Sequence, residues 1–156
     1  MVHSTIGFIH LLAAMMAMLT GALVILMPKS GVRHKQVGYA YISSMLILNA
    51  TAFQVYYLFG RFGLFHGLAL LSLASIARGI VPALVRQRVK NWMHWHYYFM
   101  TWSVVGLYSA FWAELLTRTL PMDRFWPIVA VATAVTSSVG AYFIRRNAAR
   151  LLNVSR

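Results

Sequence analysis

The chain has 156 residues, of which 60% are apolar and only 10% are charged, and its formal net charge is +12. A soluble domain carries about 25% charged residues, so this composition excludes a soluble protein and predicts an integral membrane protein. The absence of cysteine excludes disulfides, thiolate-bound iron–sulfur clusters and covalently attached c-type haem, which leaves histidine, methionine and carboxylates as ligands. The basic residues lie in short stretches between apolar runs, as membrane proteins place them, so the charge does not predict a nucleic-acid partner.

Five apolar runs of about 20 residues are each long enough to span the hydrocarbon core of a membrane. They cover residues 5–27, 37–59, 62–85, 93–117 and 126–144. The predicted fold class is therefore all-α: an integral membrane helical bundle with five transmembrane helices, in a single domain of residues 1–156. Residues 5–118 form a four-helix core, and the helix at 126–144 is peripheral or contacts another subunit. Its predicted packing face consists of Thr133, Thr136, Ser137, Ser138 and Gly140.

On each of the first two predicted helices, a histidine shares a face with residues that favour close packing. On the first helix the set is His10, Ala14, Ala17 and Gly21, and on the second it is His34, Gly38, Tyr41 and Met45. Small residues let another helix or a flat cofactor approach closely. The pattern is therefore compatible both with a cofactor slot and with ordinary helix packing.

The loops differ strongly in charge. Ten of the 14 lysines and arginines fall in the first loop, the third loop and the C-terminal tail, whereas the opposite side holds only Arg61, Arg118 and Arg124. Basic residues are retained on the cytoplasmic side, so the N-terminus is expected outside and the C-terminus in the cytoplasm. The remaining arginine, Arg78, lies inside the third helix, four residues before Pro82. It is expected either to extend its side chain to the cytoplasmic interface or to contact an anion, such as a haem propionate or a quinone-type substrate.

The histidines fall at two depths. His10 and His66 lie about four or five residues inside the outer ends of the first and third helices, and His34 and His96 lie at the inner ends of the second and fourth. Glu114, one of two acidic residues, follows His96 by 18 residues, about five helical turns, and is close to the outer level. A carboxylate within an apolar helix is costly in lipid, so Glu114 is expected to face the protein interior. His34 has a second interpretation, in which it faces cytoplasmic water.

Four short motifs carry a family resemblance: FIHLLAAMMAMLTG, KSGVRHKQVGYAY, FHGLALL and KNWMHWHYYFM. They resemble a bacterial family of predicted membrane proteins of unknown function, which implies a location in the bacterial inner membrane. More distantly, residues 7–118 are similar to the ascorbate-dependent di-haem cytochrome b family. That resemblance implies that His10 and His66 ligate one b-type haem and that His34 and His96 ligate a second. Glu114 and the fifth helix have no counterpart in it.

Three functions remain open. The first is transmembrane electron transfer by a cytochrome b-like membrane oxidoreductase with one or two b-type haems, which would meet a quinone or a small-molecule reductant. The second is a non-haem iron, copper or zinc site formed by His10, His66 and Glu114, a ligand set suited to these metals. The third is a haem-free structural or assembly subunit of a larger membrane complex or a homo-oligomer. In every case the membrane lipid is a partner.

Overall fold

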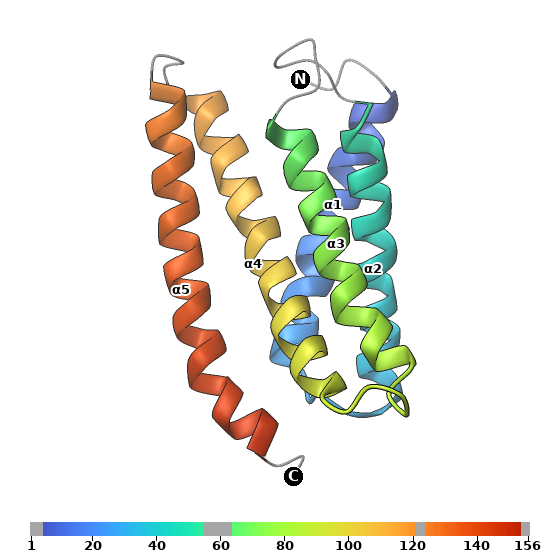
Figure 1. Ribbon diagram of the computed structural model, residues 1–156. Coiled ribbons are helices and arrows are strands. Elements are labelled where there is room, and N and C mark those ends of the chain that lie inside the picture. Colours follow the sequence, from blue (N-terminus) through green and yellow to red (C-terminus); the bar gives the residue numbers. More distant parts are fainter. Residues whose placement is uncertain (1–4, 55–63, 121–123, 154–156) are drawn as a thin grey trace. The chain divides into compact units, whose positions relative to one another are not determined.

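The computed structural model describes residues 5–54, 64–120 and 124–153, and within these ranges it contains five α-helices and no strand (Figure 1). The helices are α1 (Thr5–Leu26), α2 (Gly31–Ala52), α3 (Leu64–Leu84), α4 (Trp92–Thr119) and α5 (Phe125–Asn153). By length and composition, α1, α3, α4 and α5 can each cross a membrane. The predicted all-α membrane fold is therefore confirmed.

Two predicted helix bounds were wrong. Helix α2 begins at Gly31 rather than at residue 37, because a polar first turn with two cations can be helical without lying in the hydrocarbon core. Gly31 has a φ of 88°, which glycine adopts without steric cost. Helix α5 continues from Ile144 to Asn153, because a helix that leaves the membrane can extend into water. The predicted end of the second helix and start of the third lie outside the described residues.

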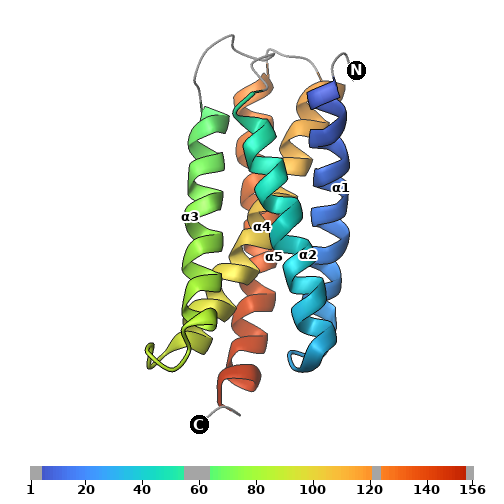
Figure 2. The same ribbon diagram turned by 90° about the vertical axis from the view of Figure 1, so that its right-hand side faces the viewer.

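The chain divides into two compact units, Met1–Ile76 and Ala77–Arg156, and the boundary falls inside α3. The predicted single domain stays a prediction. In the first unit, α1 and α2 pack side by side and antiparallel (Figures 1 and 2). Their buried residues are Ala13, Ala17, Thr20 and Gly21 on α1, and Tyr41, Met45, Asn49 and Thr51 on α2. Since Ala17 and Tyr41 are both fully covered, close helix packing accounts for much of the small-residue pattern.

The loop after α1 provides a cap for that helix. Lys29 donates hydrogen bonds from its ammonium group to the carbonyl oxygens of Val24 and Ile25. These carbonyls lack a partner within the helix, and a cation near them also offsets the negative end of the helix dipole. Burial lowers the pKa of the Lys29 ammonium.

In the second unit, α5 packs along α4. Tyr97 forms a buried cluster with Ile144, Ala148 and Leu152, and its hydroxyl donates a 2.9 Å hydrogen bond to the Ile144 carbonyl oxygen. The first turns of α4 therefore lie beside the last turns of α5. Gly140 contacts Val105 of α4. Of the predicted packing face of α5, Thr136, Ser137 and Gly140 are half-buried, whereas Thr133 and Ser138 are exposed. Contact of this face with another subunit stays a prediction.

Gly140→Ala is expected to destabilise the α4–α5 contact by about 1–3 kcal/mol, the usual cost of overpacking. A Cβ at this position would lie 2.5 Å and 2.8 Å from the two Val105 methyl groups. Val105→Ala removes both methyl groups and should recover most of the loss in the double variant. Gly106→Ala is the matched control, because nothing lies within 4 Å of its added Cβ. Thermal unfolding in detergent measures all four variants; equal effects at Gly140 and Gly106 would contradict the packing argument.

Candidate functional site

His10 of α1 is held by α2. Its Nδ1 lies 2.9 Å from the Thr51 hydroxyl, 41 residues further along the chain. That hydroxyl is also 2.8 Å from the Ile47 carbonyl oxygen and 2.9 Å from that of Leu48, and both of these are acceptors. When Thr51 donates its single hydroxyl proton to one of these carbonyls, its oxygen accepts a hydrogen bond from the Nδ1–H of His10. In that arrangement the His10 imidazole carries its proton on Nδ1 and its lone pair on Nε2.

His66 of α3 is buried, with only 5% of its surface exposed. Its ring lies 6.1 Å from the ring of Phe53, centroid to centroid. Phe53 follows Thr51 by two residues at the end of α2. The two histidines predicted to share a ligand, His10 and His66, thus both lie at the C-terminal end of α2, beside Thr51 and the capping residue Phe53. The predicted convergence of this pair on one site stays a prediction.

A further polar contact lies in the same unit. The Asn49 amide donates hydrogen bonds to the Met45 carbonyl oxygen at 2.7 Å and to the Ser72 hydroxyl at 3.2 Å. Asn49 is two residues from Thr51, and Ser72 lies six residues after His66 on α3. Buried polar groups need hydrogen-bond partners, and these pairs join α2 to both neighbouring helices of its unit. The residues around His10 and His66 therefore form a polar region among apolar helices.

His96 of α4 is held by α3 in the second unit. Its Nδ1 lies 2.9 Å from the Gly79 carbonyl oxygen. A carbonyl oxygen only accepts, so His96 also carries its proton on Nδ1 and its lone pair on Nε2. The contact depends on the absence of a side chain at Gly79, because a Cβ there would lie 2.7 Å from the Met100 sulfur. Met100 is one turn from His96, so the two residues lie on one face of α4 against Gly79.

His34 lies in the first turn of α2 and is half-buried. It belongs to the first unit, whereas His96 belongs to the second. The predicted pairing of these two histidines stays a prediction. Because α2 begins at Gly31, His34 is part of this helix, in agreement with its predicted place at the start of the second helix.

The prediction that Glu114 faces the protein interior was wrong. Its side chain is 51% exposed and forms an ion pair with Arg118, one turn further along α4. A glutamate four residues before a basic residue is the favourable order for such a pair on a helix. The ion pair with Arg118 lowers the free-energy cost of a charged carboxylate near the end of an apolar helix. Glu114 therefore needs no partner in the protein interior. Within the described residues, no three histidine, aspartate or glutamate side chains gather to hold a metal ion.

Arg78 is exposed, and its guanidinium carbon lies 5.9 Å from the centroid of the Phe99 ring. This distance is within the range of a cation–π interaction. Phe99 lies between His96 and Met100 on α4, so Arg78 adds a contact beside that of Gly79. Contact of Arg78 with an anion stays a prediction.

Thr51 and Gly79 are the two site residues that the sequence did not indicate. Thr51 is 41 residues from His10, and no pattern links them. Gly79 follows Arg78 directly, and a glycine within an apolar helix signals close approach of another group. That signal could have pointed to Gly79.

The apolar helices, with hydrogen-bonded histidines between them, define a multi-pass helical membrane protein. The chain belongs to the family of predicted membrane proteins DUF2306, whose family model matches residues 7–151. The match covers all five helices almost completely and confirms the predicted membership of a family of membrane proteins. No curated protein and no solved structure matches the chain.

Proposed function

We propose that this protein transfers electrons across the membrane through b-type haem held by paired histidines. His10 and His66 would hold one haem, and His34 and His96 would hold a second. The observation that carries the proposal is that Nδ1 of His10 and Nδ1 of His96 each lie 2.9 Å from an oxygen of a neighbouring helix. Histidines that bind metals commonly donate their other ring N–H to such an oxygen, which fixes the ring and the tautomer.

The donor set fits a haem with two axial imidazoles. Neutral imidazole binds iron through a nitrogen lone pair, and the tautomer assigned above puts that lone pair on Nε2 of both His10 and His96. With no cysteine in the chain, histidine is the strongest available ligand. A bound haem supplies a one-electron redox centre. The protein supplies the ligands, the dielectric and the hydrogen bonds that set its potential.

His66 is buried, so a haem at the proposed first pair would have one ligand that is shielded from solvent. A low dielectric disfavours the more highly charged state of a bound group and so shifts its potential. Thr51 increases the electron density on His10 by accepting its Nδ1 proton, and the Gly79 carbonyl does the same for His96. Each ligand pair has at least one member with a fixed orientation. Electrons would come from a quinone or a small-molecule reductant at one face.

The decisive measurement is an absorption spectrum of the detergent-purified protein, first oxidised and then reduced with dithionite. The expected result is a sharpened reduced-state band of low-spin b-type haem. A protein that stays colourless after expression with added haem would overturn the proposal.

A colourless protein would favour the second candidate, a haem-free structural or assembly subunit of a larger complex. The hydrogen bonds from His10 to Thr51 and from Asn49 to Ser72 are what such a subunit would need to satisfy its buried polar groups. A complex that requires this subunit should then retain its assembly in a Thr51→Ser variant, which keeps the hydroxyl, and lose stability in Thr51→Val.

The proposed location is the bacterial inner membrane, with the N-terminus outside and the C-terminus in the cytoplasm. The support is the excess of basic residues in the first loop, the third loop and the tail. A phosphatase reporter fused after Arg156 is expected to be inactive, and a fluorescent reporter that folds only in the cytoplasm is expected to be bright. The reverse pattern would show that the orientation is inverted.

A further inference from the structure

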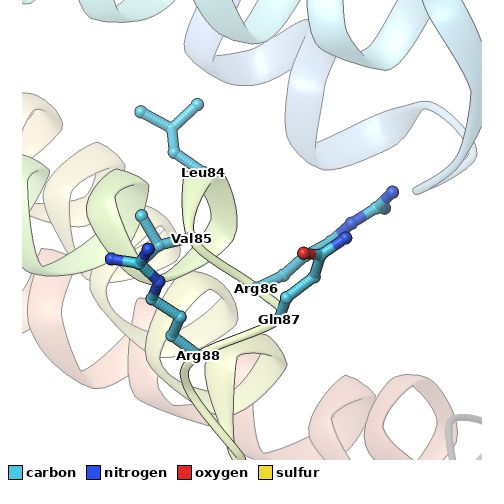
Figure 3. Close-up of a pocket in the computed structure, with 5 residues that line it drawn as sticks. All are labelled: Leu84, Val85, Arg86, Gln87 and Arg88. Atoms are coloured by element: carbon cyan, nitrogen blue, oxygen red, sulfur yellow. The ribbon is translucent and has the colours of Figure 1, made fainter.

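The connection between α3 and α4 contains a cavity of about 540 Å³ (Figure 3). Its described lining consists of Leu84, Val85, Arg86, Gln87 and Arg88. The side chains of Arg86 and Gln87 extend in the same direction, whereas that of Arg88 extends past Val85 on the other side (Figure 3). The volume lies within the range of small-molecule sites, roughly 300–1,000 Å³.

We propose that this cavity binds the phosphate group of an anionic membrane phospholipid. Guanidinium groups match phosphate oxygens with two parallel N–H donors each. Arg86 and Arg88 supply two such groups, and the Gln87 amide adds a neutral donor. The proposal depends on the membrane location of the chain and on no bound haem.

Within the described residues, these arginines have no carboxylate partner. It has two acidic residues, of which Asp123 lies outside the described residues and Glu114 pairs with Arg118 near the other end of α4. Among the described residues, no ion pair involves Arg86 or Arg88. An anion bound at either guanidinium would therefore meet no competing carboxylate among the described residues.

A lipid fits the cavity better than a free phosphate because the lining is amphipathic. Leu84 and Val85 are exposed apolar residues at the end of an apolar span, directly before the two arginines. They can cover the glycerol and upper acyl carbons of a lipid whose phosphate is bound by Arg86 and Gln87, which extend to the same side, while Arg88 adds positive charge on the other side of the connection (Figure 3). Trp92 and Trp95 at the start of α4 mark the same interface, where amphipathic rings are favoured. Basic pockets at such interfaces recognise lipid headgroups.

The helix dipole acts against an anion here, since α3 ends with its negative pole at this loop. The main chain reduces this effect by using two of the terminal carbonyls. The Val85 N–H bonds the Val81 carbonyl oxygen at 3.0 Å, and the Arg88 N–H bonds that of Val85 at 2.8 Å. The carbonyl oxygens of Val81 and Val85 are therefore already engaged by main-chain N–H donors.

The test uses the purified full-length chain in a neutral detergent. Its probes are phosphatidylglycerol, phosphatidylcholine and inorganic phosphate, with binding followed by native mass spectrometry and by thermal unfolding. Phosphatidylglycerol is expected to bind and to raise the midpoint of unfolding, whereas phosphatidylcholine at equal concentration does not. The Arg86→Gln/Arg88→Gln variant should raise the Kd for phosphatidylglycerol about tenfold or more, given the strength of charge-assisted hydrogen bonds.

The matched control is Arg145→Gln/Arg146→Gln, which removes the same charge from α5 near the same end of the second unit. It should leave the Kd unchanged, and an equal loss in both variants would reduce the effect to net charge and overturn the site. Equal protection of the wild type by inorganic phosphate would overturn the lipid as ligand. These wild-type comparisons hold even where a variant does not fold. Arg86→Lys/Arg88→Lys should retain only part of the affinity, because lysine cannot bind two phosphate oxygens in parallel.

Discussion

Replacing His10 or His66 with alanine is expected to remove the reduced-state absorption band of one b-type haem. On the proposed function, each variant would lack one of the two axial ligands to the same iron. Both variants should therefore lose the same absorption band and, if the wild type binds two haems, half of the bound haem. Difference spectra and the haem-to-protein ratio measure this. His94→Ala is the matched control, because His94 is exposed at the start of α4 and is not a proposed ligand.

Thr51→Val distinguishes a ligand from a histidine that serves packing alone. Valine keeps the shape of threonine and removes the hydroxyl that accepts the His10 Nδ1 proton at 2.9 Å. Loss of such a partner commonly weakens metal binding by about 10- to 100-fold. The Thr51→Val variant is expected to bind haem more weakly and to have a shifted midpoint potential, while its helix content is unchanged.

For the alanine variants, equal haem binding by the wild type, His10→Ala and His94→Ala would refute the assignment of His10 as a ligand.

The course of the membrane helices was largely predictable from the sequence. Apolar runs must lie in lipid and their backbone groups must bond internally, so hydropathy alone located α1, α3, α4 and the membrane part of α5 within a few residues. The start of α2 and the end of α5 were not predictable in this way. Both segments are polar, and polarity indicates only that a segment leaves the hydrocarbon core, while its residues can remain helical.

The side-chain contacts of the site were harder to predict from the sequence. The depth of His10 and His66 in the membrane could be predicted from their positions along the helices. The contacts of His10 with Thr51 and of His66 with Phe53 could not, because they depend on how helices distant in sequence pack together. For Glu114, the sequence analysis predicted a buried contact that the structure does not contain. The cost of a carboxylate in lipid predicted a buried partner, whereas Arg118 one turn away already provides one at the surface. Near a helix end, an ion pair with a residue one turn away can therefore stabilise a carboxylate that is not buried.

Gly79→Ala is expected to produce the second large effect, on the contact between α3 and α4. The added Cβ would lie 2.7 Å from the Met100 sulfur, 2.9 Å from its Cγ and 3.2 Å from its backbone nitrogen. The methionine side chain is flexible and can move, but the backbone of α4 cannot yield as easily. Overpacking of this kind costs about 1–3 kcal/mol. Gly67→Ala on the same helix is the matched control, since nothing lies within 4 Å of its added Cβ.

The same substitution should also affect His96, because moving α4 away from Gly79 lengthens the 2.9 Å bond from Nδ1 to the Gly79 carbonyl oxygen. On the proposed function, Gly79→Ala therefore weakens the haem of His34 and His96 and leaves that of His10 and His66 intact. Met100→Ala removes the sulfur and Cγ contacts but retains the backbone contact, so the double variant should recover part of the stability and part of the haem. Thermal unfolding and difference spectra separate the two effects. Lost stability with unchanged spectra would limit Gly79 to packing, and unchanged stability would show that α3 and α4 are not in contact at this position.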